Sequence, residues 1–72
     1  MKGLATFVKE KRKLAGLTQE EFADRAGVAL TVIRKIEQGK DNLNLSSVND
    51  VLMMFGHVLA PVNRKDILDT DQ

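Results

Sequence analysis

Basic side chains are the groups of this sequence that could bind a charged ligand, and they are concentrated in its first half. Residues 1–40 carry nine lysines and arginines against five acids, a net charge of +4. Residues 41–72 carry two against five, a net charge of −3. Clustered cations bind polyanions such as nucleic acids, although an ordinary solvated surface of mixed charge can have the same numbers of basic and acidic residues. The asymmetry therefore favours a polyanion on the N-terminal half without deciding the function.

The groups that enzymes use are scarce. The 72 residues include no cysteine and no tyrosine, and the single histidine, His57, lies beside a short apolar stretch rather than a carboxylate. The sequence has no glycine-rich loop of the kind that cradles phosphate, and no set of metal ligands at suitable spacing from His57. Met53 and Met54 suit the filling of gaps or the contact of a partner better than a ligand site. We predict no enzymatic activity, no metal and no cofactor.

The length of 72 residues is room for one domain. A chain this short buries roughly 60% of its unfolded surface, so self-association would help it to fold. The absence of cysteine excludes a disulfide framework. Its apolar runs are far shorter than the ~18 residues of a membrane span, and residues 1–8 lack a full signal-peptide core and cleavage site. We expect a soluble, cytoplasmic domain that is not attached to a membrane.

Two helices are predicted before residue 27. Apolar residues at helical spacing over residues 4–15 predict the first, with Gly16 as its stop. The run Thr18–Glu21 has the spacing of a capping box, so the second helix is expected to begin at Gln19. Gly27 ends it, because glycine takes a positive φ at little steric cost.

Two further helices are predicted between residues 28 and 56. The apolar face of the third consists of Val28, Val32, Ile33 and Ile36, and this helix ends at Gln38-Gly39. Asn44 is the predicted N-cap of the fourth helix, and Gly56 is its stop. The buried face of this fourth helix would consist of Leu45, Val48, Val51, Leu52 and Phe55.

The window from Gln19 to Gln38 is the most informative part of the sequence, because it has the features of a helix-turn-helix. Such a motif needs a small residue where the helices cross, a residue tolerant of αL in the turn, and apolar residues that lock the second helix onto the first. Ala23 and Gly27 meet the first two demands. The third is met by Phe22, Ala26, Val28, Ile33 and Ile36.

The sequence resembles the Cro/repressor (XRE) family of helix-turn-helix proteins. The resemblance rests on the stretch LTQEEFA at residues 17–23, followed by IRKIEQGK at residues 33–40, and it extends over residues 4–56. It implies an all-α fold, a lambda-repressor-like DNA-binding domain of four to five helices that occupies residues 1–56.

The resemblance also implies which residues contact DNA. Members of the family lay the third helix in the major groove, so its outward side chains are the candidates for base and near-base contacts, here Leu30, Thr31, Arg34, Lys35 and Gln38. Phosphate contacts are implied for Gln19, at the start of the second helix, and for Lys40. A basic–acidic pair between Arg12 and Glu37 is implied to tie the first helix to the end of the third.

Each of these assignments has an alternative, and two residues depart from the family pattern. Arg34 and Lys35 could belong to an ordinary solvated face, and Arg12 and Glu37 could be independent surface charges worth under about 1 kcal/mol as a pair. Ala29 stands where an N-cap serine or threonine is usual, and Leu30 where a hydrogen-bonding residue is common. The resemblance then implies base readout partly through apolar contact with thymine methyl groups.

The segment after Gly56 resembles the short C-terminal strand of HipB-type antitoxins, a branch of the same family. Residues 57–62 are aliphatic and β-branched and include the only proline, which suits an edge strand or an extended arm. A lone strand is not stable, so we predict that it pairs with the same strand of a second copy in a homodimer, through Val58, Leu59 and Val62. The alternative is dimerisation through the fourth helix with Met53, Met54 and Phe55. Residues 63–72 are predicted to form a mobile acidic tail.

Together these features predict a sequence-specific repressor. We expect it to bind, as a homodimer, an inverted-repeat operator in double-stranded DNA. The likeness to HipB-type proteins further implies the autoregulatory antitoxin of a HipBA-like toxin–antitoxin operon, with a HipA-like kinase toxin as its partner. The alternative is a free-standing phage-type repressor without a toxin.

Overall fold

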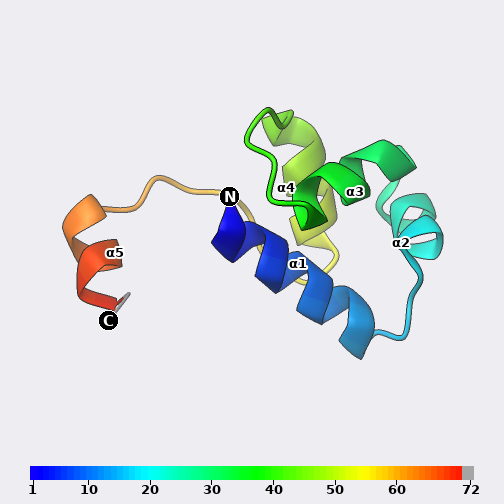
Figure 1. The fold of residues 1–72 in the computed structure, drawn as a ribbon, viewed down its shortest axis with the longest axis horizontal. Coiled ribbons are helices and arrows are strands. Elements are labelled where there is room, and N and C mark those ends of the chain that lie inside the picture. Colours follow the sequence, from blue (N-terminus) through cyan, green and yellow to red (C-terminus); the bar gives the residue numbers. More distant parts are fainter. Residues whose placement is uncertain (71–72) are drawn as a thin grey trace.

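The fold consists of helices and connecting segments. The computed structural model describes the backbone of residues 1–70 and the side chains of residues 1–67. In this part of the chain five helices follow one another and no strand is formed (Figure 1): α1 (Lys2–Leu14), α2 (Gln19–Ala26), α3 (Leu30–Glu37), α4 (Leu45–Met53) and α5 (Arg64–Thr70). The predicted all-α class is confirmed. None of the helices in residues 1–70 combines the length and the apolar character needed to cross a bilayer.

The bounds of α2 follow from local hydrogen bonds, as the sequence predicts. The Glu21 N–H donates to Thr18 Oγ1 at 3.1 Å, and the Thr18 N–H donates to Glu21 Oε1 at 2.9 Å. These two bonds satisfy backbone donors that the first turn of a helix leaves without partners. The bond from the Thr18 N–H also lowers the pKa of the Glu21 carboxyl that accepts it. Gly27 ends the helix with φ at 72°, a conformation that side chains disfavour. Both predicted signals are confirmed.

α3 begins two residues later than its apolar pattern suggests. Val28 lies in the turn, where its N–H donates to the Ala23 carbonyl oxygen at 3.0 Å. Ala29 is the N-cap, and its side chain forms no cap hydrogen bond because it has no polar atom. The turn between α2 and α3 is therefore fixed by a glycine and by backbone hydrogen bonds.

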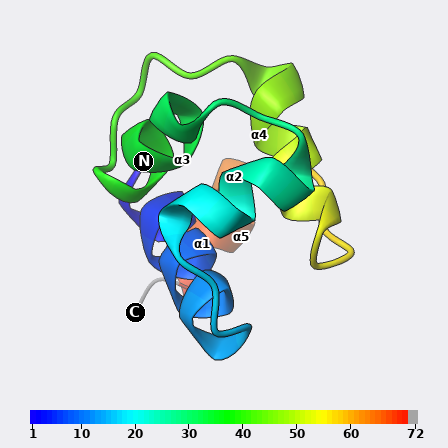
Figure 2. The same cartoon turned by 90° about the vertical axis from the view of Figure 1, so that its right-hand side faces the viewer.

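A single core holds α1 to α4 together, and α3 lies at its centre. α3 packs against α1, α2 and α4, and Figure 2 shows these four helices clustered together. Phe22 of α2 is fully buried, and its ring lies 5.5 Å from the ring of Phe55 after α4. The buried residues are Val8, Leu17, Phe22, Ala23, Ile33, Ile36, Val48, Val51 and Leu52. Ile33 and Ile36 anchor one face of α3, and this fixes which face points outward.

One residue of the predicted buried face of α4 is not buried. Leu45 is 66% exposed, whereas Val48, Val51 and Leu52 are buried and Phe55 is half-buried. The predicted N-cap is confirmed, because Asn44 Oδ1 accepts a hydrogen bond from the Ser47 N–H at 3.1 Å. Leu45 is the first residue of α4, so its side chain lies at the edge of the core and lines a shallow hollow with Leu59 and Pro61 instead.

The segment from His57 to Asn63 has no regular secondary structure in the single chain, so the strand predicted at residues 57–62 is not present here. A strand requires a partner strand, and the described residues contain none. Two hydrogen bonds tie the segment to α4: the His57 N–H donates to the Leu52 carbonyl oxygen at 3.0 Å, and the Leu59 N–H donates to Asn49 Oδ1 at 2.7 Å. Leu59 packs against the core, while Val58 and Val62 are 64% and 60% exposed.

Part of the predicted tail is helical. α5 lies apart from the other helices (Figure 1), in a region where the sequence analysis predicted no regular element. Its start is stabilised by Asn63, whose Oδ1 accepts from the Lys65 N–H at 2.8 Å. Residues 71 and 72 of the predicted tail lie outside the described residues.

Candidate nucleic-acid interface

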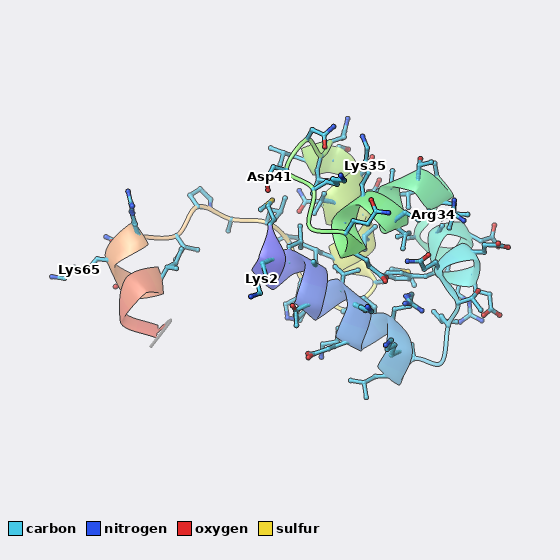
Figure 3. The ribbon with its side chains drawn as sticks, viewed as in Figure 1. Lys2, Arg34, Lys35, Asp41 and Lys65 are labelled. Carbon is cyan, nitrogen blue, oxygen red and sulfur yellow. The ribbon has the colours of Figure 1, made fainter. Side chains whose placement is uncertain are left out.

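The outward face of α3 carries polar and basic side chains that are free to meet a ligand. Thr31, Arg34, Lys35 and Gln38 are exposed, on the side of α3 opposite to its buried isoleucines. Figure 3 shows Arg34 and Lys35 along this helix. Guanidinium, ammonium and amide groups donate hydrogen bonds to base edges and to phosphate oxygens. The structure therefore brings four of the predicted contact residues onto one surface.

Leu30 differs from these four because it is only partly accessible. It is half-buried, packs against the core, and lines the edge of a hollow of about 510 Å³. Arg12, Thr18, Gln19, Glu20 and Arg34 complete the lining of this hollow. The hollow joins the outward face of α3 to the first turn of α2, so a ligand on α3 would also meet residues at the start of α2.

Arg12 and Glu37 form a bidentate ion pair at the junction of α1 and α3. Arg12 Nε donates to Glu37 Oε2 at 2.7 Å, and Arg12 Nη2 donates to Glu37 Oε1 at 3.0 Å. A third bond runs from Arg12 Nη1 to the Leu17 carbonyl oxygen at 2.9 Å. The two side chains are 12% and 5% exposed, so this is a largely buried pair rather than two independent surface charges.

Gln19 lies where a phosphate contact is expected, but it also has a role that the sequence analysis missed. Its Nε2 donates to Glu37 Oε1 at 3.2 Å. No local pattern could have indicated this bond, because the two residues are 18 positions apart. Gln19 thus links the start of α2 to the last residue of α3, and one amide hydrogen remains for another acceptor.

The charge of Glu37 is stabilised by its neighbours. Burial alone raises the pKa of this carboxyl, but hydrogen bonds from Arg12 and Gln19 and the charges of Arg12 and Lys9 outweigh burial and hold the pKa below its usual range. The bond to Glu37 in turn raises the pKa of Arg12. The pair stays ionised at neutral pH, and its two charges cancel. The outward face of α3 therefore keeps the positive charge of Arg34 and Lys35.

The remaining predicted residues lie in two places. Lys40 is exposed just beyond α3, and its N–H donates to the Lys35 carbonyl oxygen at 3.1 Å. It extends the basic surface past the end of that helix. Val58, Leu59 and Val62 belong to the segment tied to α4, so the structure does not bring them together with the contact residues of α3.

Metal ligands do not gather beside this surface in the part of the chain that the structure describes. Among these residues no three His, Cys, Asp or Glu side chains gather at a distance suited to a metal ion. The ring of His57 lies 4.8 Å from the ring of Phe7, and its Nδ1 is 2.7 Å from the Phe55 carbonyl oxygen. The outward face of α3 is suited to binding a polyanion that also presents hydrogen-bonding groups, as the bases of DNA do.

Comparison with known proteins agrees with this geometry. A family model described as helix-turn-helix matches residues 8–56, which extend from Val8 in α1 to the turn after α4. A protein of Methanothermobacter thermautotrophicus named as an uncharacterized HTH-type transcriptional regulator is 36% identical over 53 residues. The matched part covers 74% of this chain and 77% of that protein.

Proposed function

The chain belongs to the helix-turn-helix family, and on this premise we propose that it is a homodimeric repressor whose α3 lies in the major groove of an inverted-repeat operator. A transcriptional regulator with a helix-turn-helix domain acts through DNA. The observation that supports the placing of α3 in the major groove is the chemistry of its outward face. Its exposed side chains can all donate hydrogen bonds, and the one carboxylate of α3 is neutralised by Arg12.

The proposed contacts divide into two kinds. Arg34, Lys35 and Gln38 are proposed to contact base edges, with Thr31 beside them and the accessible part of Leu30 against a thymine methyl group. Gln19, in the first turn of α2, and Lys40, just beyond α3, are proposed to contact phosphates. Base contacts confer sequence preference, whereas phosphate contacts strengthen binding to any sequence.

Two substitutions separate the two kinds of contact. Lys35→Ala is expected to cost on the order of 1–3 kcal/mol on a duplex enriched from a random pool by the wild-type protein, and to change binding to a scrambled duplex little. Gln19→Ala is expected to weaken both duplexes more evenly. Fluorescence anisotropy titrations measure the four affinities, with Lys65→Ala on the separate helix α5 as the control. Equal losses for Lys35→Ala on both duplexes would remove Lys35 from the base-reading set.

The homodimer is proposed to form through residues 57–62. Within the described residues the N–H groups of Val58, Ala60 and Val62 donate to no acceptor, while that of Leu59 donates to Asn49. The exposed Val58 and Val62 alternate with the inward Leu59, as in an extended segment with one free edge. The same segment of a second copy, paired across a two-fold axis, would satisfy these donors and cover both valines.

We further propose that the chain is the autoregulatory antitoxin of a HipBA-like operon. This second proposal rests on the position of the extended segment directly after the helix-turn-helix domain. A free-standing phage-type repressor is the alternative. Expression of the chain together with its neighbouring genes, followed by mass spectrometry of what copurifies, decides between them. A kinase-like protein bound to the chain supports the antitoxin, and a pure homodimer supports the free-standing repressor.

A further inference from the structure

A second hollow lies between the first half of α1 and the end of α3. It has a volume of about 460 Å³, and its walls include Lys2, Thr6 and Lys9 of α1 together with Glu37, Gln38 and Gly39. Lys2 and Lys9 are both exposed. In Figure 3, Lys2 lies at the beginning of α1. Because Gln38 and Gly39 form part of its wall, the hollow adjoins the end of the helix that is proposed to enter the groove.

The two lysines belong to one face of α1. Lys2, Thr6 and Lys9 are separated by four and three residues, the spacing at which helical side chains become neighbours. Lys11 lies on a different face, with its Nζ 5.6 Å from the centre of the Phe7 ring. The cations of α1 are therefore divided between a face that lines the hollow and a face that does not.

The carboxylates near the hollow accept hydrogen bonds from cations, whereas neither lysine side chain has a hydrogen-bond partner among residues 1–67, although the charge of Lys9 helps to lower the pKa of Glu37. Glu37 is bound by Arg12, and Asp41 Oδ1 accepts a hydrogen bond from the Met1 ammonium group at 2.7 Å. Within the described residues neither Lys2 nor Lys9 forms an ion pair or a hydrogen bond through its side chain. The hollow therefore offers two ammonium groups that lack a direct ion-pair or hydrogen-bond partner in this part of the chain, together with the Thr6 hydroxyl, as donors for an anion.

We propose that this hollow is a second phosphate-binding surface, which holds the sugar–phosphate backbone beside the groove that α3 occupies, with Lys2 and Lys9 as its cations. The inference rests on the proposed function, because it places α3 in a major groove. Strands of phosphates border that groove on both sides, so a cationic surface that adjoins the end of α3 lies next to one of them. These contacts would lengthen the footprint on the duplex without adding any preference for sequence.

The dependence of binding on salt tests this surface. The affinity of the wild-type chain for a scrambled 24-base-pair duplex is measured by fluorescence anisotropy over a series of KCl concentrations. Each phosphate contact contributes about 0.9 to the slope of the logarithm of affinity against the logarithm of salt. We expect the variant with both Lys2→Gln and Lys9→Gln to lose about 1.8 of this slope, and Lys2→Gln alone to lose about 0.9. Lys11→Gln, an equal change of charge on the other face of α1, should leave the slope unchanged.

The outcomes separate this inference from the function on which it rests. If the wild-type chain binds and the double variant keeps the wild-type slope, the hollow holds no phosphate and the inference is overturned while the proposed function stands. If Lys11→Gln lowers the slope as much as Lys2→Gln, the effect is one of net charge and the inference is again overturned. A wild-type chain that does not bind duplex DNA overturns the proposed function itself. Urea unfolding of each variant checks that it is folded, and Lys2→Gln avoids the neighbourhood of Glu37.

Discussion

Arg12→Ala is expected to lower the free energy of unfolding by about 3 kcal/mol or more. The substitution leaves the Glu37 carboxylate, which is 5% exposed, without the guanidinium that neutralises it. It also leaves the Leu17 carbonyl oxygen without its Arg12 donor. A domain of 72 residues has a total stability of about 4 to 11 kcal/mol, so this loss is a severe fraction of it. Urea melts followed by circular dichroism measure the change.

Two further variants identify the cause of the loss. Lys13→Ala removes an exposed cation from the same helix and should change stability by less than about 0.5 kcal/mol. Replacing both members of the pair, with Arg12→Met and Glu37→Leu, removes the buried charge altogether and should recover most of what Arg12→Ala loses. An Arg12→Ala melt within error of the wild type would mean that the pair behaves as a surface ion pair.

Truncation before His57 is expected to yield monomers that bind the operator roughly 100-fold more weakly or worse. Linking two binding units multiplies their affinity by about 10² to 10⁴, and a monomer has no such gain. The nine buried core residues all precede His57, so the helices that form the core should remain folded. Analytical ultracentrifugation measures the assembly state, and anisotropy on the enriched duplex measures the affinity.

Full-length variants separate the proposed strand from the alternative interface on α4. Val58→Glu with Val62→Glu changes two exposed side chains of the segment and should produce monomers without disturbing Leu59. Met53→Glu with Met54→Glu, on the exposed part of the α4 end, should leave the dimer intact. A truncated chain that dimerises as tightly as the full-length chain would show that residues 57–62 are not the interface.

The elements that position α3 could be predicted from the sequence because their signals are local. The capping box at Thr18 and Glu21 and the positive φ of Gly27 each depend on residues within one turn. The apolar spacing of Ile33 and Ile36 likewise determines which face of α3 is buried. These three features together decide which side chains point outward.

Features that depend on distant residues were predicted less well. The contact of Arg12 with Glu37, 25 positions apart, was expected only through a family resemblance, and the bond from Gln19 to the same carboxylate was missed. Hydrophobic spacing predicted that Leu45 lies in the core. The direction of a side chain at the first position of a helix, however, also depends on how the preceding loop enters that helix. The polar composition of residues 63–72 concealed the N-cap signal of Asn63.

The predicted strand differs from these cases, because a strand at residues 57–62 needs a second chain. The β-branched residues and the one proline indicate that an extended segment is favoured, and residues 57–63 form no helix. Pairing across a two-fold axis depends on a surface that a single chain does not contain.

Selection of duplexes from a random-sequence pool by the wild-type chain tests the central proposal most directly, namely that two copies of α3 read DNA together. The pool is passed repeatedly over the immobilised protein, and the retained duplexes are sequenced. We expect enrichment of an inverted repeat whose half-sites lie about one helical turn apart, ~34 Å or about 10 base pairs from centre to centre. A retained pool without a shared sequence, or one that contains only isolated half-sites, would contradict the account.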